Sequence, residues 1–143
     1  MSRIDEATTI LAALGLPPAQ QNERSALTLL ALAKLGPADC WTAVQRPLLR
    51  IWDIMGFMRD RHGKDYAANS RETIRRQTIH QFEQARLIDR NPDAPDRPTN
   101  SGKTAYQLTE EAAIVLRAYG KPGFDKAVIE FTGQFGSLRA IFF

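Results

Sequence analysis

Hydrogen-bonding side chains are concentrated between residues 69 and 80 of this 143-residue chain. Arginine can form two hydrogen bonds with guanine, and asparagine or glutamine can do so with adenine, so these side chains suit the reading of base edges. The candidates for base contacts are Asn69, Ser70, Arg71, Thr73, Arg75, Arg76, Gln77 and His80. This composition predicts a surface that reads nucleic acid, although the solvated face of an ordinary charged helix has a similar pattern.

The charge around this segment favours the same interpretation. Residues 46–77 contain eight arginines and lysines against four acids, and the whole chain has a formal net charge of +3. Clustered basic side chains attract the phosphates of nucleic acids. We therefore expect the basic surface to coincide with the reading segment.

The first half of the chain is predicted to be helical. A short amphipathic helix covers residues 4–14, and a second helix runs from Asn22, as its N-cap, to about Leu35. The second helix is apolar on nearly every side, which predicts a central core helix. Pro47 is expected in the first turn of a third helix that ends at Gly63. The apolar residues at helical spacing are Leu48, Ile51, Trp52, Met55 and Met58, and the two methionines are expected to fill the core.

The reading segment itself is predicted to be a helix over about residues 69–86, opened by a capping box of Asn69 and Glu72. Its inward face is expected to carry Ile74, Thr78, Phe82 and Ala85. Its outward face is expected to carry Glu72, Arg75, Arg76, His80 and Glu83. Ile79 falls between the two faces and does not fit the helical period.

Two short strands, at residues 87–90 and 103–108, flank a turn-rich segment. Helices follow from Thr109 to about Tyr119 and over about residues 122–136, the last with an apolar stripe of Phe124, Val128, Phe131 and Phe135. Helix, helix, strand, long turn and strand is the order of a winged helix. The predicted fold is therefore mainly α with a small β-hairpin, a winged helix-turn-helix with extra N- and C-terminal helices. We expect one domain over residues 1–143, with its core at about 20–120.

In a winged helix the hairpin lies beside the reading helix along the DNA backbone. The wing residues expected to hold backbone are Arg97, Asn100, Ser101 and Lys103. Residues 101–104, Ser-Gly-Lys-Thr, resemble the end of a phosphate-binding loop, but Arg97 stands where its first glycine belongs and a strand follows instead of a helix. A nucleotide site is therefore not predicted.

Other kinds of site have little support in the sequence. His62 and His80 have no cysteine, histidine or paired carboxylate at ligand spacing, so no metal site is predicted. Cys40 is expected to be a small buried or half-buried residue, and a single cysteine fits the cytoplasm. We find neither a secretory signal nor an apolar run long enough to span a membrane.

Three stretches resemble the amino-terminal domain of BsuBI/PstI-type restriction endonucleases: residues 19–33, 71–82 and 91–101. The resemblance implies the helix-turn-helix recognition domain of a type II enzyme that cuts duplex DNA. It also implies the family site CTGCAG and a Mg²⁺-dependent nuclease domain later in the chain. A homodimer would suit such a palindrome.

Nucleases of this broad class hold Mg²⁺ with acids and place a lysine in the pattern [DE]-x-K. None of the five lysines of this chain has an acid two residues before it. We therefore expect no catalytic residue, metal or cofactor in this chain and expect Mg²⁺ in a catalytic domain that is not present. A freestanding winged-helix transcriptional regulator, with the last two helices as a dimer contact, and a winged helix that binds only proteins remain alternatives.

Overall fold

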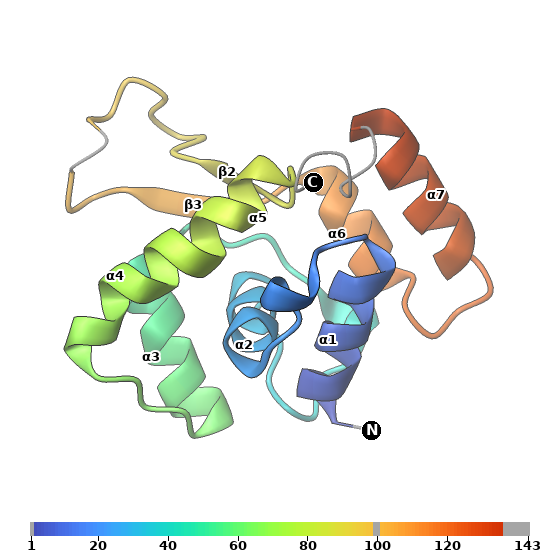
Figure 1. The fold of residues 1–143 in the computed structure, drawn as a ribbon, viewed down its shortest axis with the longest axis horizontal. Helices are drawn as coiled ribbons and strands as arrows, with labels where there is room; N and C mark the ends of the chain where they lie inside the picture. Colours follow the sequence, from blue (N-terminus) through green and yellow to red (C-terminus); the bar gives the residue numbers. More distant parts are fainter. Residues whose placement is uncertain (1, 99–100, 136–143) are drawn as a thin grey trace.

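The computed structural model describes residues 2–98 and 101–135. The central element is helix α2 (Glu23–Leu32), which lies between α1 (Arg3–Ala13) and α3 (Ile51–His62) (Figure 1). Every residue of α2 from Ser25 to Leu32 is buried. The side chain of Asn22 caps this helix by accepting a hydrogen bond from the amide of Ser25 at 2.8 Å. The predicted core helix and its N-cap are confirmed.

A three-stranded antiparallel sheet covers one side of this helical core. It consists of β1 (Leu49–Arg50), β2 (Ile88–Arg90) and β3 (Ala105–Leu108), with β3 in the middle. Leu49 pairs with Tyr106, and Ile88 pairs with Leu108. The mainly helical fold with a hairpin is confirmed, and the order of elements from α2 to β3 is that of a winged helix.

Strand β1 was not predicted, and it changes the start of α3. Pairing with β3 keeps residues 49–50 extended, so the helix begins at Ile51 and Pro47 lies outside it. The backbone amide of Arg50, which precedes the helix, donates a hydrogen bond to the Asp53 carboxylate at 2.9 Å. Met55 and Met58 are buried, so their prediction as core residues is confirmed, whereas Leu48 (41%) and Trp52 (49%) are exposed.

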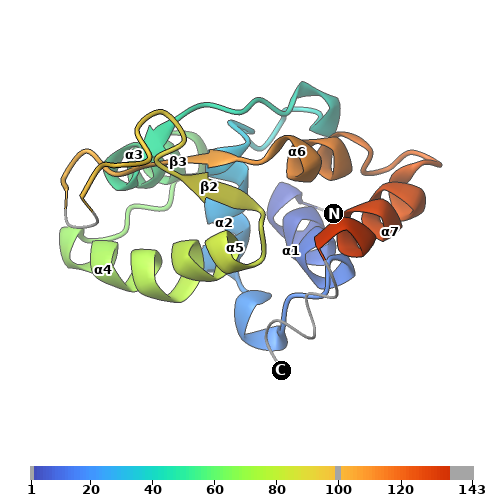
Figure 2. The same ribbon diagram turned by 90° about the horizontal axis from the view of Figure 1, so that it is seen from above.

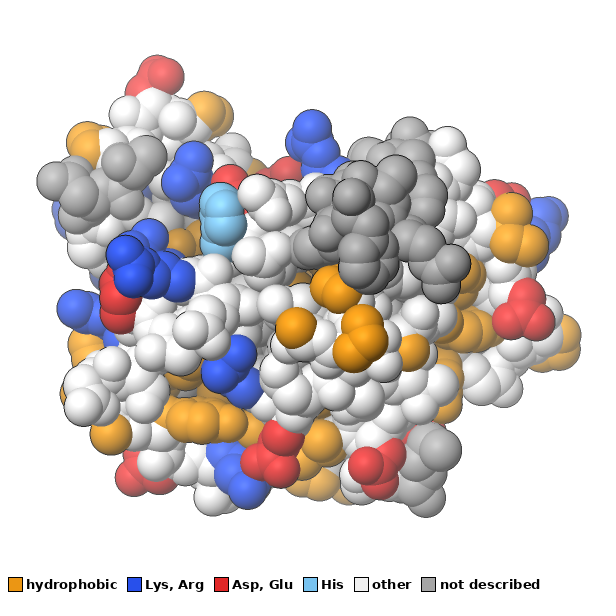
Figure 3. Space-filling model, in the orientation of Figure 1, with side chains coloured by type: hydrophobic (Ala, Val, Ile, Leu, Met, Phe, Trp, Pro, Cys, Tyr) orange, Lys and Arg blue, Asp and Glu red, His pale blue; other side chains and the backbone are white. Residues whose placement is uncertain are grey.

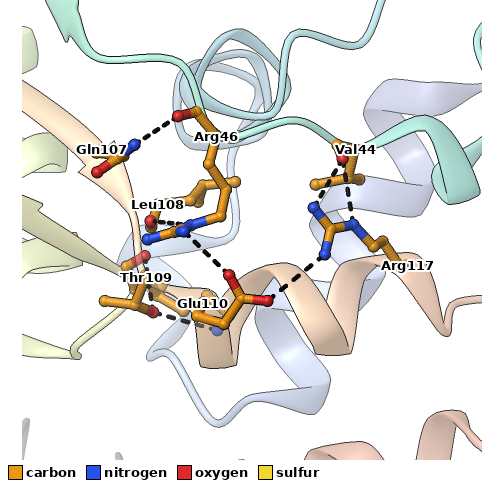
Figure 4. Close-up of polar contacts among 9 residues, drawn as sticks. Val44, Arg46, Gln107, Leu108, Thr109, Glu110 and Arg117 are labelled. Carbon is orange, nitrogen blue, oxygen red and sulfur yellow. Dashed lines mark hydrogen bonds and ion pairs between the residues drawn. The ribbon is translucent and has the colours of Figure 1, made fainter.

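A polar network ties the segment before β1 to the base of the hairpin (Figure 4). The Arg46 guanidinium donates to the Leu108 carbonyl at 2.9 Å and to Glu110 at 3.0 Å. Arg117 donates to the Val44 carbonyl at 3.1 Å. Arg117 is part of α6 (Glu110–Arg117), and Arg46 pairs with Glu110 at the start of that helix. The network therefore fixes the hairpin relative to the carboxyl-terminal helices.

Helices α6 and α7 (Phe124–Phe135) pack together at the end opposite α4 (Arg71–Ile74) (Figures 1 and 2). Helix α6 starts beside Thr109 as predicted, and the Thr109 hydroxyl caps it by accepting from the amide of Ala112 at 3.1 Å. Phe131 is buried, and Phe124 and Val128 pack against the core, whereas the predicted position of the Phe135 side chain lies outside the described residues.

Short 3₁₀ turns connect the helices at Pro18–Gln20 (η1) and Trp41–Ala43 (η2). Cys40 precedes the second turn and is exposed, so the expectation that it is buried or half-buried is wrong. The turn places the neighbouring Trp41 in the core and leaves Cys40 outside. Among the described residues, no helix is both long and apolar enough to cross a bilayer.

Candidate nucleic-acid interface

The predicted reading helix is one continuous helix that changes its winding in the middle. It consists of a 3₁₀ turn η3 (Ala68–Ser70), α4 (Arg71–Ile74), a π turn η4 (Arg75–Ile79) and α5 (His80–Gln84). The π turn closes where the amide of His80 donates to the carbonyl of Arg75. We refer to residues 71–84 as the recognition helix.

The π turn explains the residue that did not fit the sequence period. A wider turn holds an extra residue, so both Thr78 and Ile79 face the core, although a regular α-helix would place them less favourably. Ile74 and Phe82 are fully buried on the same side, as predicted. The opposite side stays exposed, and Figure 3 shows basic side chains and a histidine gathered there, over the left part of that face.

The N-terminus of the recognition helix differs from the prediction. Asn69 lies in η3 and forms no capping box with Glu72, because the 3₁₀ turn moves the helix start to Arg71. Glu72 instead accepts hydrogen bonds from Arg75, through Nε at 3.2 Å and also through Nη2, and lies 3.4 Å from Nε of Arg76. The hydrogen bond from Arg75 holds the pKa of Glu72 below its usual range.

Most predicted base-contact residues lie on the outer surface of this helix. Arg76 is the most accessible of the arginines that pair with Glu72, with 75% of its side chain exposed. Asn69, Arg71, Thr73, Arg75, Gln77 and His80 are also exposed, and Ser70 is partly so. These positions are accessible from outside the molecule, and base contact itself stays a prediction.

Neighbouring elements hold some of these side chains in place. Arg24 of α2, which the sequence analysis did not single out, donates to Gln77 at 3.3 Å and to the buried Thr78 at 2.9 Å. The Arg71 guanidinium lies 5.0 Å from the centre of the Trp52 ring. The amide of Gln84 lies 3.3 Å from Nε2 of His80.

The wing is organised by Asn91, which is buried and has a positive φ of 52°. Its side-chain oxygen accepts from the amide of Ala105 and from the Arg97 guanidinium, both at 2.9 Å. Arg97 also pairs with Asp93 at 2.9 Å, and only 17% of its side chain is exposed. Arg97 therefore braces the wing from within, and its predicted phosphate contact stays a prediction.

Two of the other predicted wing residues, Ser101 and Lys103, line different grooves. The first, the helix–wing groove, has a volume of about 570 Å³ and is lined by Ile51, Trp52, Arg71, Glu72, Arg75, Arg90, Ser101, Gly102, Thr104 and Tyr106. The second, of about 320 Å³, is lined by Leu48, Arg50, Asp53, Asp93, Arg97, Lys103 and Ala105. Ser101 thus faces the recognition helix and Lys103 faces the other groove, while Asn100 lies outside the described residues.

The basic residues of the stretch 46–77 do not form one surface, contrary to expectation. Arg46 pairs with Glu110, Arg61 with Asp39 at 3.1 Å, and Lys64 with Glu23 at 2.7 Å. Each of these ion pairs joins two segments that are distant in sequence. The basic side chains left on the outer surface of the recognition helix are those of Arg71, Arg75 and Arg76.

The part of the chain that the structure describes contains no group of three or more histidines, cysteines and acids that could hold a metal ion. The candidate site described above is the arginine-bearing surface beside the hairpin. The comparison with known proteins agrees with that architecture. The model of the BsuBI/PstI restriction endonuclease HTH domain family matches residues 1–140. This chain belongs to that family.

Individual relatives extend the match to enzymes. The type II restriction enzyme BsuBI of Bacillus subtilis is 48% identical over 118 residues, which cover 82% of this chain and 37% of that protein. The type II restriction enzyme AplI of Arthrospira platensis is 31% identical over 94% of this chain and 41% of its own length. The structure of SdaI restriction endonuclease matches with a TM-score of 0.90 and 37% identity, over 96% of this chain and 43% of that one. The chain therefore spans less than half the length of these relatives.

Proposed function

We propose that this chain is the DNA-recognition domain of a type II restriction endonuclease. The observation that carries the proposal is the outward surface of the recognition helix, where Arg75 and Arg76 stand exposed beside the hairpin. The major groove of B-DNA admits one α-helix and presents a distinct pattern of donors and acceptors for each base pair. A rigid helix that carries arginines on its free side suits that groove.

Within this proposal the exposed residues have two roles. Arg76 and the polar residues on the outer surface of the recognition helix read base edges, and the hairpin follows the backbone. Phosphate contacts supply much of the affinity without information on sequence, whereas base contacts supply the choice of site. Lys103, exposed on the wing, is assigned to phosphate.

The relatives support further parts of the proposal. Because this chain covers only about 40% of them, we assign phosphodiester hydrolysis and its Mg²⁺ to the remaining part of a longer parent protein. CTGCAG is the proposed recognition site. A homodimer in the cytoplasm, with one subunit on each half of the palindrome, completes the assignment.

The test is a titration of the chain against a CTGCAG duplex and a scrambled duplex at two salt concentrations. Arg76→Ala is expected to lower the discrimination between them by about 1–3 kcal/mol, because it removes a base contact. Lys103→Ala is expected to weaken binding of both duplexes about equally. Binding that does not weaken as salt rises would refute the proposal, and equal losses on both duplexes from Arg76→Ala would refute the reading role.

A further inference from the structure

We propose that Trp52 is a DNA-contacting residue of this domain. Its indole supports the guanidinium of Arg71, and the pair binds one strand of the duplex, with the arginine on a phosphate and the indole against the adjoining deoxyribose. This inference rests on the proposed function and adds a residue that no sequence pattern singled out for binding.

The exposure of Trp52 is the first observation. The chain has two tryptophans, and they differ sharply: Trp41 is 5% exposed and packs against Tyr119, whereas Trp52 is 49% exposed. Tryptophan carries a large apolar surface, so a half-exposed Trp52 lacks much of the hydrophobic stabilisation that Trp41 gains from being buried. An exposed tryptophan near a proposed binding surface is typical of a contact residue.

The neighbourhood of Trp52 indicates what it contacts. Trp52 lines the helix–wing groove with Arg71, Arg75 and Arg90, and the acid among the lining residues is Glu72. Three guanidinium groups against one carboxylate give this groove a basic character. The groove also adjoins the N-terminal end of the recognition helix through Arg71, Glu72 and Arg75, so a strand seated against that end of the helix passes the groove. Charge and continuity therefore favour a polyanion as its occupant over a neutral protein surface.

The Arg71–Trp52 contact gives the pair its specific chemistry. The guanidinium carbon lies 5.0 Å from the centre of the indole ring, within the range of a cation–π interaction. An arginine stacked on an aromatic ring keeps the donors at its edge free, and their planar arrangement matches two phosphate oxygens. The indole thus holds Arg71 in a binding orientation before the ligand arrives, and its uncovered area is available for an apolar sugar face.

Fluorescence can test the contact directly, because single-tryptophan variants separate the two indoles. In Trp41→Phe, emission reports Trp52, and acrylamide quenching is expected to drop toward that of a buried indole once the CTGCAG duplex saturates the protein. In the matched variant Trp52→Phe, emission reports Trp41, and quenching is expected to be the same with and without DNA. If duplex binds, as measured by anisotropy of labelled DNA, and Trp52 remains equally quenched, the inference is refuted and the proposed function stands. In that case the exposed indole is left for contacts with the rest of the parent protein.

A double-mutant cycle tests how the pair acts. Trp52→Ala is expected to weaken DNA binding about two- to fivefold by loss of the cation–π support. The same change in an Arg71→Ala background is expected to have a smaller effect, because the supported group is already gone.

Leu48→Ala is the control, since Leu48 is a similarly exposed apolar residue that lines the other groove. An equal loss from Leu48→Ala, or full additivity of the two changes, would overturn the proposed role of the pair. No binding of any duplex would refute the proposed function and, with it, this inference.

Discussion

Replacing Glu72 by glutamine tests how the recognition helix limits indiscriminate binding. The carboxylate holds Arg75 through hydrogen bonds and lies 3.4 Å from Nε of Arg76. Glutamine has nearly the same shape and no charge, so both arginines become more available to phosphates. We expect Glu72→Gln to bind random duplex more tightly than the unmodified chain and to discriminate the CTGCAG duplex less well.

The size of the effect follows from counterion release. Each additional phosphate that the protein neutralises on B-DNA steepens the dependence of log affinity on log salt by about 0.9. Lowering salt fourfold, from about 200 to about 50 mM, should therefore increase the ratio of variant to unmodified affinity by roughly 3.5-fold for each additional phosphate that the variant binds. Since Glu72 pairs with two arginines, the upper limit is about twelvefold.

The measurement is fluorescence anisotropy with a scrambled duplex across a salt series. Asp125→Asn is the matched control, because it removes the same charge from an exposed position in the first turn of α7, at the opposite end of the molecule (Figures 1 and 2). A general change in net charge would affect both variants alike. The reasoning fails if the salt dependence of Glu72→Gln matches that of Asp125→Asn.

Three further predictions concern the scaffold, and urea denaturation measures each. Asn91→Ala should cost about 2–4 kcal/mol, because the buried amide of Ala105 loses its side-chain partner and alanine must adopt a positive φ; a cost below about 1 kcal/mol would contradict the bracing role. Phe82→Ala should cost about 3–5 kcal/mol by opening a cavity beneath the recognition helix, whereas the exposed Gln84→Ala should change little. The Arg97 hydrogen bond lowers the pKa of Asp93, so this pair stabilises the folded chain above the ordinary aspartate pKa of about 3.9 and loses that contribution as pH falls through the lowered value. Asp93→Asn should flatten this part of the acid profile, and an unchanged profile would count against it.

The sequence predicted elements with long, regular signals and missed those decided by tertiary pairing. The continuous apolar run of α2 and its Asn22 cap could be assigned because each signal is local. Strand β1 could not, since two residues become a strand only when the edge of β3 lies beside them. Trp52 shows the same limit, because helical spacing marks an apolar residue without showing whether anything covers it.

The candidate site also contains residues whose position was predictable from the sequence and residues whose role was not. The outward position of Arg75 and Arg76 follows from their spacing against Ile74 and Phe82, and it was predictable. The internal role of Arg97 was not, because it depends on the positive φ of Asn91, which brings an amide oxygen and a guanidinium together. Composition marks an arginine as a possible phosphate ligand but does not reveal which acid it pairs with in the fold.

The π turn allows the recognition helix to hold one more residue without losing its contact with the core. A π turn is wider than an α turn, so the extra residue is taken up within Arg75–Ile79, and Ile74 and Phe82 on its two sides remain buried. Deleting one residue within the turn would restore the regular period of about 3.6 residues, in which positions seven apart point in nearly the same direction. Both halves would then keep their buried side, so this scaffold can gain or lose a residue on its exposed surface while its core stays unchanged.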